Sequence, residues 1–237
     1  MTEGSSGSGN STNTASDNVK SLIQKAETIP LQTPYSDYIE PFSQEQWYKN
    51  IVKSIKGKQN SVLNLINENA AAKNPKLIIL GDIFYSMNIN CAALQSFVQE
   101  ICDEFDLTTD VSSAMVKKLT KEGVVIFDTS TYKIEGKCDT INDDWKMMIK
   151  QIVTGILNES SNHDNHIMLL TMGAGNNMIS RDLITNGVIE SANVISTGHP
   201  SPKAAHSNFR NSNCFKETNQ KLMKKGLLPV RFGVVFT

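Results

Sequence analysis

A histidine and a serine alternate with prolines in the segment His199-Pro200-Ser201-Pro202, which follows the β-prone run Val194-Ile195-Ser196. Each proline fixes its own φ near about −65° and favours extended backbone in the residue before it. Such a segment can hold an imidazole and a hydroxyl, both of which can donate hydrogen bonds, in fixed directions at the end of a strand. The alternative interpretation is a proline-stiffened surface loop in which the histidine is incidental.

Polar or small residues also follow three other hydrophobic runs. Asp82 follows LIILG, Asp128-Thr129-Ser130 ends and follows GVVIF, and Gly173-Ala174-Gly175 follows HIMLLTM. Ligands of parallel sheets bind at the carboxyl ends of the strands. We therefore expect these residues and His199 to lie together at one edge of a sheet, which favours a functional site over the incidental loop.

The predicted strands and helices that must position these residues alternate along the chain, which favours a parallel sheet covered on both faces. The predicted fold is α/β, a three-layer α/β/α arrangement with a central four-stranded, mainly parallel sheet. The expected strands are Lys76–Asp82, Gly123–Asp128, His166–Gly173 and Asn193–His199, and the expected helices between and after them are Ala93–Phe105, Asp144–Leu157 and Phe215–Lys225.

The N-terminal part divides into four predicted segments. Residues 1–18 are rich in Ser, Gly, Asn and Thr and are expected to be a disordered tail. Next come a predicted helix over Val19–Glu27, a Pro/Tyr-rich linker over Ile29–Phe42 and a helix from Ser43. The last of these begins with a capping-box pattern over Ser43–Gln46. Residues 19–237 are expected to form a single domain.

Composition narrows the class of protein. The 237 residues carry a formal net charge of −1, so no global basic field favours nucleic acid, although the end of the chain is locally basic. The four cysteines form no CxxC pair and no zinc spacing, and we interpret them as reduced thiols of an intracellular protein. No apolar run approaches the roughly 18 residues of a membrane helix. We expect a soluble protein without metal or membrane contact.

Several motifs, in order and with compatible spacing over about Gln46 to Val230, resemble family-1 uracil-DNA glycosylases. HPSP and the later CFKETNQKL resemble the family's HPSPLS segment and the F-x-x-T-N-x-x-L pattern of its next helix. LIILGDIFYS stands where the family has LGQDPYH, and GVVIFDTS where it has a strand ending in Asn. LLTMGAG resembles LLWGS, and the helix that contains Trp145 resembles the family's Trp-bearing helix.

The resemblance implies an enzyme that flips uracil out of single- or double-stranded DNA and hydrolyses its glycosidic bond as a monomer, without metal or cofactor, in the nucleus or cytoplasm. It implies that His199 donates a hydrogen bond to O2 of the departing uracil and that Ser201 donates to a DNA phosphate. Tyr85 matches the tyrosine that excludes thymine, and Phe84 stands beside it in the base-binding segment. For each, a purely structural role is the alternative.

The position that activates water in the family departs from the pattern. The family's aspartate falls on Ile83, which can neither orient water nor stabilise a cation. Asp82 lies one position earlier, and neighbours on an extended segment point in opposite directions. It could replace the missing carboxylate only in a re-registered loop; otherwise it caps the loop.

The position that reads the base is also changed, because Asp128 replaces the family's amide. An ionised carboxylate only accepts hydrogen bonds, so it would repel uracil O4 but could accept from the amine of cytosine. A protonated carboxyl would keep one donor. A strand-end aspartate that caps the next turn is the structural alternative.

Other family features are lost. The chain between Tyr85 and Leu94 is too short for the family's stacking phenylalanine and its proline-rich loop. Lys203 replaces the leucine that the family inserts into the base stack. A lysine is a poor wedge between bases but can bind a DNA phosphate, and the structural alternative is a solvated lysine. Gly173-Ala174 replaces a Gly-Ser phosphate contact, where backbone amides can still face DNA.

These departures leave three hypotheses. The first is a divergent uracil-DNA glycosylase, a base-excision repair hydrolase of weak activity. The second is a catalytically silent family member that acts as a DNA-binding or replication accessory scaffold with a protein partner. The third is altered specificity for cytosine through Asp128. A pocket lined by Tyr85, Asp128 and His199 would favour an enzyme. A pocket filled by Ile83 and Phe84 would favour a scaffold.

Overall fold

The computed structural model describes residues 31, 33–55, 66, 72, 75–82, 91–108, 115–130, 142–161, 166–201 and 208–233. The predicted tail over residues 1–18 and the predicted helix Val19–Glu27 lie outside these residues. All four strands expected from the sequence lie within them.

Four strands form one parallel sheet at the centre of the molecule. They are β1 (Leu77–Gly81), β2 (Val124–Asp128), β3 (Met168–Met172) and β4 (Val194–Thr197). Their order is β2-β1-β3-β4, and all three pairings are parallel. The four strands predicted from the sequence are thus confirmed, each with ends within two residues of those expected.

Alternate side chains of each strand enter different cores. Leu77 and Ile79 of β1 pack on one face of the sheet, whereas Ile78 and Leu80 pack on the other. Every residue of β1 is buried, because helices cover both faces. This explains the continuous hydrophobic runs in the sequence, which lack the polar alternation of a half-exposed strand.

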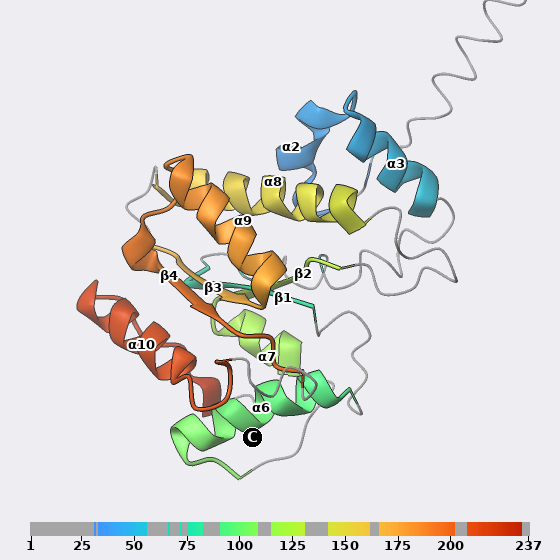
Figure 1. Ribbon diagram of the computed structural model, residues 1–237. Coiled ribbons are helices and arrows are strands. Elements are labelled where there is room, and N and C mark those ends of the chain that lie inside the picture. Colours follow the sequence, from blue (N-terminus) through green and yellow to red (C-terminus); the bar gives the residue numbers. More distant parts are fainter. Residues whose placement is uncertain are drawn as a thin grey trace, which may run out of the picture.

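The helices lie in two layers, as Figure 1 shows. One layer holds α8 (Asn142–Ser161) and α9 (Ala174–Thr185), with α2 (Ser36–Ile39), the 3₁₀ turn η1 (Glu40–Phe42) and α3 (Gln46–Ile55) packed around α8. The other holds α6 (Ala92–Phe105), α7 (Met115–Lys121) and α10 (Cys214–Lys224), and the 3₁₀ turn η4 (Ser191–Asn193) leads into β4. The predicted three-layer α/β/α fold is confirmed.

The predicted helices between and after the strands are present, but α7 and α9 were not expected. The buried face of α9 is Asn176, Ile179, Ser180 and Leu183, which has helical spacing. Two of these four residues are polar, so the hydrophobic periodicity that indicates a helix is missing from the sequence. The seven residues of α7 are too few to show a period.

The N-terminal predictions need two corrections. The segment predicted as a linker over Ile29–Phe42 contains α2 and η1. The predicted capping box at Ser43 does not start the helix, because α3 begins at Gln46 and the Ser43 N–H closes η1 by donating to the Glu40 carbonyl. Pro41 sets this 3₁₀ turn, since its fixed φ suits the first positions of a helical turn.

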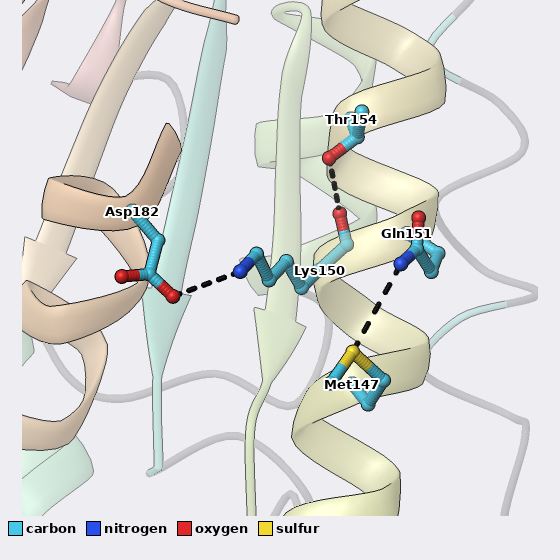
Figure 2. Close-up of polar contacts among 5 residues, drawn as sticks. All are labelled: Met147, Lys150, Gln151, Thr154 and Asp182. Atoms are coloured by element: carbon cyan, nitrogen blue, oxygen red, sulfur yellow. Dashed lines mark hydrogen bonds and ion pairs between the residues drawn. The ribbon is translucent and has the colours of Figure 1, made fainter. Parts of the chain in front are cut away.

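A polar contact joins α8 to α9 across the surface of their layer. Figure 2 shows Lys150 Nζ of α8 pointing to Asp182 Oδ2 of α9 at 2.8 Å. On α8 itself, Thr154 Oγ1 donates to the Lys150 carbonyl at 2.8 Å. Asp182 is exposed and Lys150 partly exposed, so the pair helps to align the two helices without adding much stability. Among the described helices, none has the length and apolar character needed to cross a membrane.

Candidate active site

The strand register places the predicted site residues at one edge of the sheet. Gly81 of β1 is paired with Asp128 of β2, and Met172 of β3 with Thr197 of β4. Each strand ends at the residue named in its pair, so Asp82, Thr129 and Gly173, one residue further, and His199, two residues further, all emerge at the carboxyl edge. This agrees with the expectation that the ends of these strands converge.

His199 lies against the backbone of Gly173. A Cβ atom built on Gly173 would be 3.2 Å from Cδ2 and 3.3 Å from Cβ of His199. Gly173 has φ +93° and ψ 156°, a conformation that is essentially restricted to glycine. Its N–H donates to the Thr197 carbonyl at 3.0 Å, which ties the end of β3 to the end of β4. Glycine at this position therefore creates the space for the imidazole.

A hydrogen bond within the proline segment orients the imidazole. The backbone N–H of Ser201 donates to His199 Nδ1 at 3.0 Å, and Pro200 between them is buried. A ring nitrogen that accepts carries no proton, so the neutral imidazole carries its proton on Nε2. The ring is half-buried. The segment thus presents a neutral hydrogen-bond donor at the edge of the sheet.

Asp82 belongs to a polar cluster with two residues from other elements. The hydroxyl of Thr129, just after β2, donates to Asp82 Oδ1 at 2.7 Å and also contacts Asn176 Oδ1 of α9. Asn176 is anchored in turn, because its Nδ2 donates to the Met172 carbonyl at 2.8 Å. One hydroxyl proton serves one acceptor at a time, so the two oxygens share it. The cluster aims one carboxylate oxygen of Asp82 along the edge towards β2.

Asn176 was not among the residues singled out in the sequence. It is 1% exposed, and buried amides are hydrogen-bonded. An amide side chain a few residues after a predicted strand is the sequence signal that could have identified it. Thr129 stood in the strand-end group Asp128-Thr129-Ser130 but was given no role. Its N–H donates to the Gly81 carbonyl at 2.9 Å, which continues the pairing of β1 and β2 past the strand end.

Asp128 ends β2 in a buried position, with 4% of its surface exposed. Its carbonyl accepts a hydrogen bond from the indole Nε1 of Trp145 at 2.9 Å. Trp145 is itself buried in the first turns of α8. The indole thus anchors the backbone of Asp128 and with it the end of β2.

The N-terminus of α9 faces the same edge. Gly173 precedes the helix, and its first residues, Ala174 and Gly175, are exposed. The N–H groups of a first helical turn and the positive end of the helix dipole favour an anion such as phosphate. The expected contact of Gly173 and Ala174 with DNA is thus compatible with the backbone here.

The remaining predicted site residues, Ile83, Phe84, Tyr85 and Lys203, lie outside the described part of the chain. Among the residues that are described, no three His, Cys, Asp or Glu side chains gather as a metal site would require.

The residues of the F-x-x-T-N-x-x-L pattern lie on the buried face of α10. Phe215, Thr218, Asn219 and Leu222 are all buried. Asn219 makes two hydrogen bonds to Val230, accepting from its N–H at 2.8 Å and donating to its carbonyl at 3.0 Å. This pattern therefore marks the fold, whereas the basic residues Lys216 and Lys224 of the same helix are exposed.

Comparison with solved structures identifies similar folds. Mimivirus uracil-DNA glycosylase has 12% sequence identity and a TM-score of 0.61, over 90% of this chain and 92% of that one. Two single-residue variants of mimivirus UNG in complex with UGI each have 11% identity and TM-scores of 0.63 and 0.61, over 89% of this chain and 93% of theirs. No family model and no curated protein matches the sequence. At this identity the likeness establishes the fold.

Proposed function

We propose that the protein is a uracil-DNA glycosylase-like DNA-binding protein that hydrolyses the N-glycosidic bond of a flipped uracil slowly. The observation that carries the proposal is the position and orientation of the His199 ring. Gly173 makes room for the imidazole, and the Ser201 N–H leaves the ring proton on Nε2. A neutral donor in this position suits a leaving group that departs as an anion.

In the proposed reaction the bond between the sugar C1′ and uracil N1 breaks, and its electron pair leaves with the base. The Nε2–H group of His199 donates a hydrogen bond to uracil O2, where part of this negative charge collects. Water adds to C1′ and loses a proton to the solvent, and the uracil anion takes up a proton from the solvent, so that neutral uracil is released. We propose that Asp82 positions this water through the carboxylate oxygen that does not receive the Thr129 hydroxyl.

DNA is proposed to lie along the carboxyl edge of the sheet. The N-terminus of α9, at Gly173 and Ala174, would receive a phosphate, and Ser201 and Lys203 would contact others. Uracil would enter beside Asp128, Phe84 and Tyr85. The fold shared with mimivirus uracil-DNA glycosylase supports this orientation.

The first experiment is a single-turnover assay with excess protein on a single-stranded oligonucleotide that contains one uracil. We expect slow release of uracil, and a decrease of about 10²–10³-fold in His199→Ala, the usual cost of removing one preorganised donor. His166→Ala is the matched control, because His166 is exposed at the opposite edge, ahead of β3. Equal rates for the two variants would refute the role of His199.

A second candidate is a catalytically silent scaffold that binds DNA or a replication partner. It is favoured by Ile83 in the place of a carboxylate and by the hydrogen bond that holds Asp82 Oδ1 against Thr129. Ile83→Asp separates the two candidates. Faster uracil release in this variant supports a weakened enzyme, whereas no release in either form, with retained binding to the same oligonucleotide, supports the scaffold.

A further inference from the structure

A cleft lies between α2 and the last turns of α8. It has a volume of about 480 Å³, within the usual range of ligand sites. Its floor includes Gly155, which is 13 residues after the start of α8 and hence about 20 Å along the helix from its first residue. None of the residues assigned above to DNA or uracil lines this cleft.

Two tyrosine rings form the wall of the cleft. Their centroids are 6.1 Å apart, with 20° between the planes of Tyr35 and Tyr38. The Tyr35 ring also packs edge-on against buried Phe127, with 5.7 Å between centroids. Tyr38 lies directly on the backbone of α8, where a Cβ on Gly155 would overlap its ring. The rings are thus held in place by the fold.

Carboxylates accompany these rings. Glu159 accepts a hydrogen bond from the Tyr38 hydroxyl, and Asp37 of α2 also lines the cleft. Both acids are exposed, and no described residue forms an ion pair with either. Among the described residues, no Lys, Arg or His lines the cleft. Burial raises the pKa of Tyr35 to about 12, so this phenol stays neutral and the carboxylates set the charge.

Aromatic faces together with carboxylates are complementary to a cation. A guanidinium group fits this combination better than an ammonium group, because its plane stacks on an aromatic ring while its N–H groups reach carboxylate oxygens. Glu159 keeps one oxygen for such a contact after it has accepted the Tyr38 hydroxyl. We propose that the cleft formed by Tyr35, Tyr38, Asp37 and Glu159 binds an arginine side chain of a partner protein.

The test is an NMR titration of the full-length protein labelled with ¹³C in its tyrosines. The probe is N-acetyl-arginine methylamide, and the comparison is its neutral isostere, N-acetyl-citrulline methylamide. We expect saturable shifts of the Tyr35 and Tyr38 signals, and about tenfold weaker binding of the citrulline compound, which carries no positive charge and cannot form an ion pair with the carboxylates. No shift, or equal binding of the two compounds, would overturn the proposal.

Variants identify the groups responsible. Glu159→Gln and Asp37→Asn should each weaken binding of the arginine probe several-fold, because each removes one carboxylate. Glu190→Gln, which removes an exposed carboxylate outside the cleft, should leave it unchanged. Tighter binding of tetramethylammonium than of the arginine probe would indicate a small quaternary ammonium ligand and overturn the arginine assignment. DNA binding should be the same in all three variants, which separates this test from that of the proposed function.

Discussion

At the scale of single residues, the contact between Gly173 and His199 determines what the carboxyl edge can do. The imidazole needs the space that a side chain at Gly173 would occupy, and the backbone there has a φ of +93°. The Ser201 N–H then selects the ring nitrogen that keeps the proton. Gly173, His199 and Ser201, which come from two segments, thus produce one oriented hydrogen-bond donor, although each is a common type of residue.

Gly173→Ala should destabilise the protein and displace the imidazole. We expect a loss of about 1–3 kcal/mol in the free energy of unfolding, because alanine is strained at this φ and its Cβ crowds His199. Urea denaturation measures the loss, and the ¹H–¹³C signals of the His199 ring report its displacement.

Gly175→Ala is the matched control for that variant. A Cβ at Gly175 meets nothing within 4 Å, and the residue lies in the first turn of α9. Alanine should therefore be neutral or add up to about 1 kcal/mol of stability. Equal stability of Gly173→Ala and Gly175→Ala would contradict the close contact with His199.

At the scale of elements, two buried glutamates of α6 hold the segment that leads into α10. Glu100 accepts the backbone N–H groups of Asn211 and Ser212 at 2.9 and 2.8 Å. Glu104 accepts those of Phe215 and Lys216 at 3.3 and 2.6 Å, so it satisfies the first turn of α10. Carboxylates at a helix N-terminus also interact favourably with its dipole. The start of α10 is thus fixed by a different helix.

The Glu104 carboxyl should make stability depend on pH. Burial raises its pKa above the usual value of 4.5, and this outweighs the lowering by the N–H groups of Lys216 and Phe215. The folded state then binds the proton more tightly than the unfolded chain, so the contribution of Glu104 to stability is fully present below pH 4.5 and is lost as the pH rises through the folded pKa.

Glu104→Gln removes this titration. Its cost relative to the unmodified protein should therefore be greater near pH 4.5 than at pH 8, as measured by urea denaturation at both values. Glu217→Gln is the control at pH 8, because its ion pair with Lys221 is on the surface and contributes less than about 1 kcal/mol. A cost for Glu104→Gln that is constant, or greater at pH 8, would be evidence against the raised pKa.

At the scale of the whole molecule, one sheet separates two cores that share no side chain among the described residues. Phe215 of α10 lies in the core beneath the sheet, with ring centroids 5.2 Å from Phe97 and 5.0 Å from Phe232. The protein's two tryptophans, Trp47 and Trp145, belong to the layer on the opposite face. This distribution allows the prediction of a single domain over residues 19–237 to be tested.

Phe215→Ala should cost about 3–5 kcal/mol, because it removes a fully buried aromatic ring and leaves a cavity. If the two cores unfold together, tryptophan fluorescence and far-UV circular dichroism should show the same decrease in urea midpoint, although both tryptophans lie across the sheet from the substitution. Leu228→Ala, at a position 79% exposed, should change stability by less than about 0.5 kcal/mol. A tryptophan transition unaffected by Phe215→Ala would show that the layers unfold independently.

The sheet and most of its helices could be predicted from sequence because their signals are local. Continuous runs such as Ile78-Ile79-Leu80 can be stable only where both faces are covered, and that requirement implies α/β layers. The helix α9 was missed for the opposite reason, since its buried face contains the polar residues Asn176 and Ser180, which also contact Thr129 and Ser196 from distant parts of the chain.

For the site, the order of residues along the chain was enough to predict that Asp82, Asp128, Gly173 and His199 stand at or just beyond the ends of four strands. Parallel strands bring such ends to one edge. Which of these residues touch one another depends on the folded molecule. The spacing along the chain does not reveal that Thr129 joins Asp82 and Asn176, or that the ring of His199 lies on Gly173. These contacts depend on strand register and on the crossing of a helix over the sheet, and both are set by packing among residues far apart in the chain.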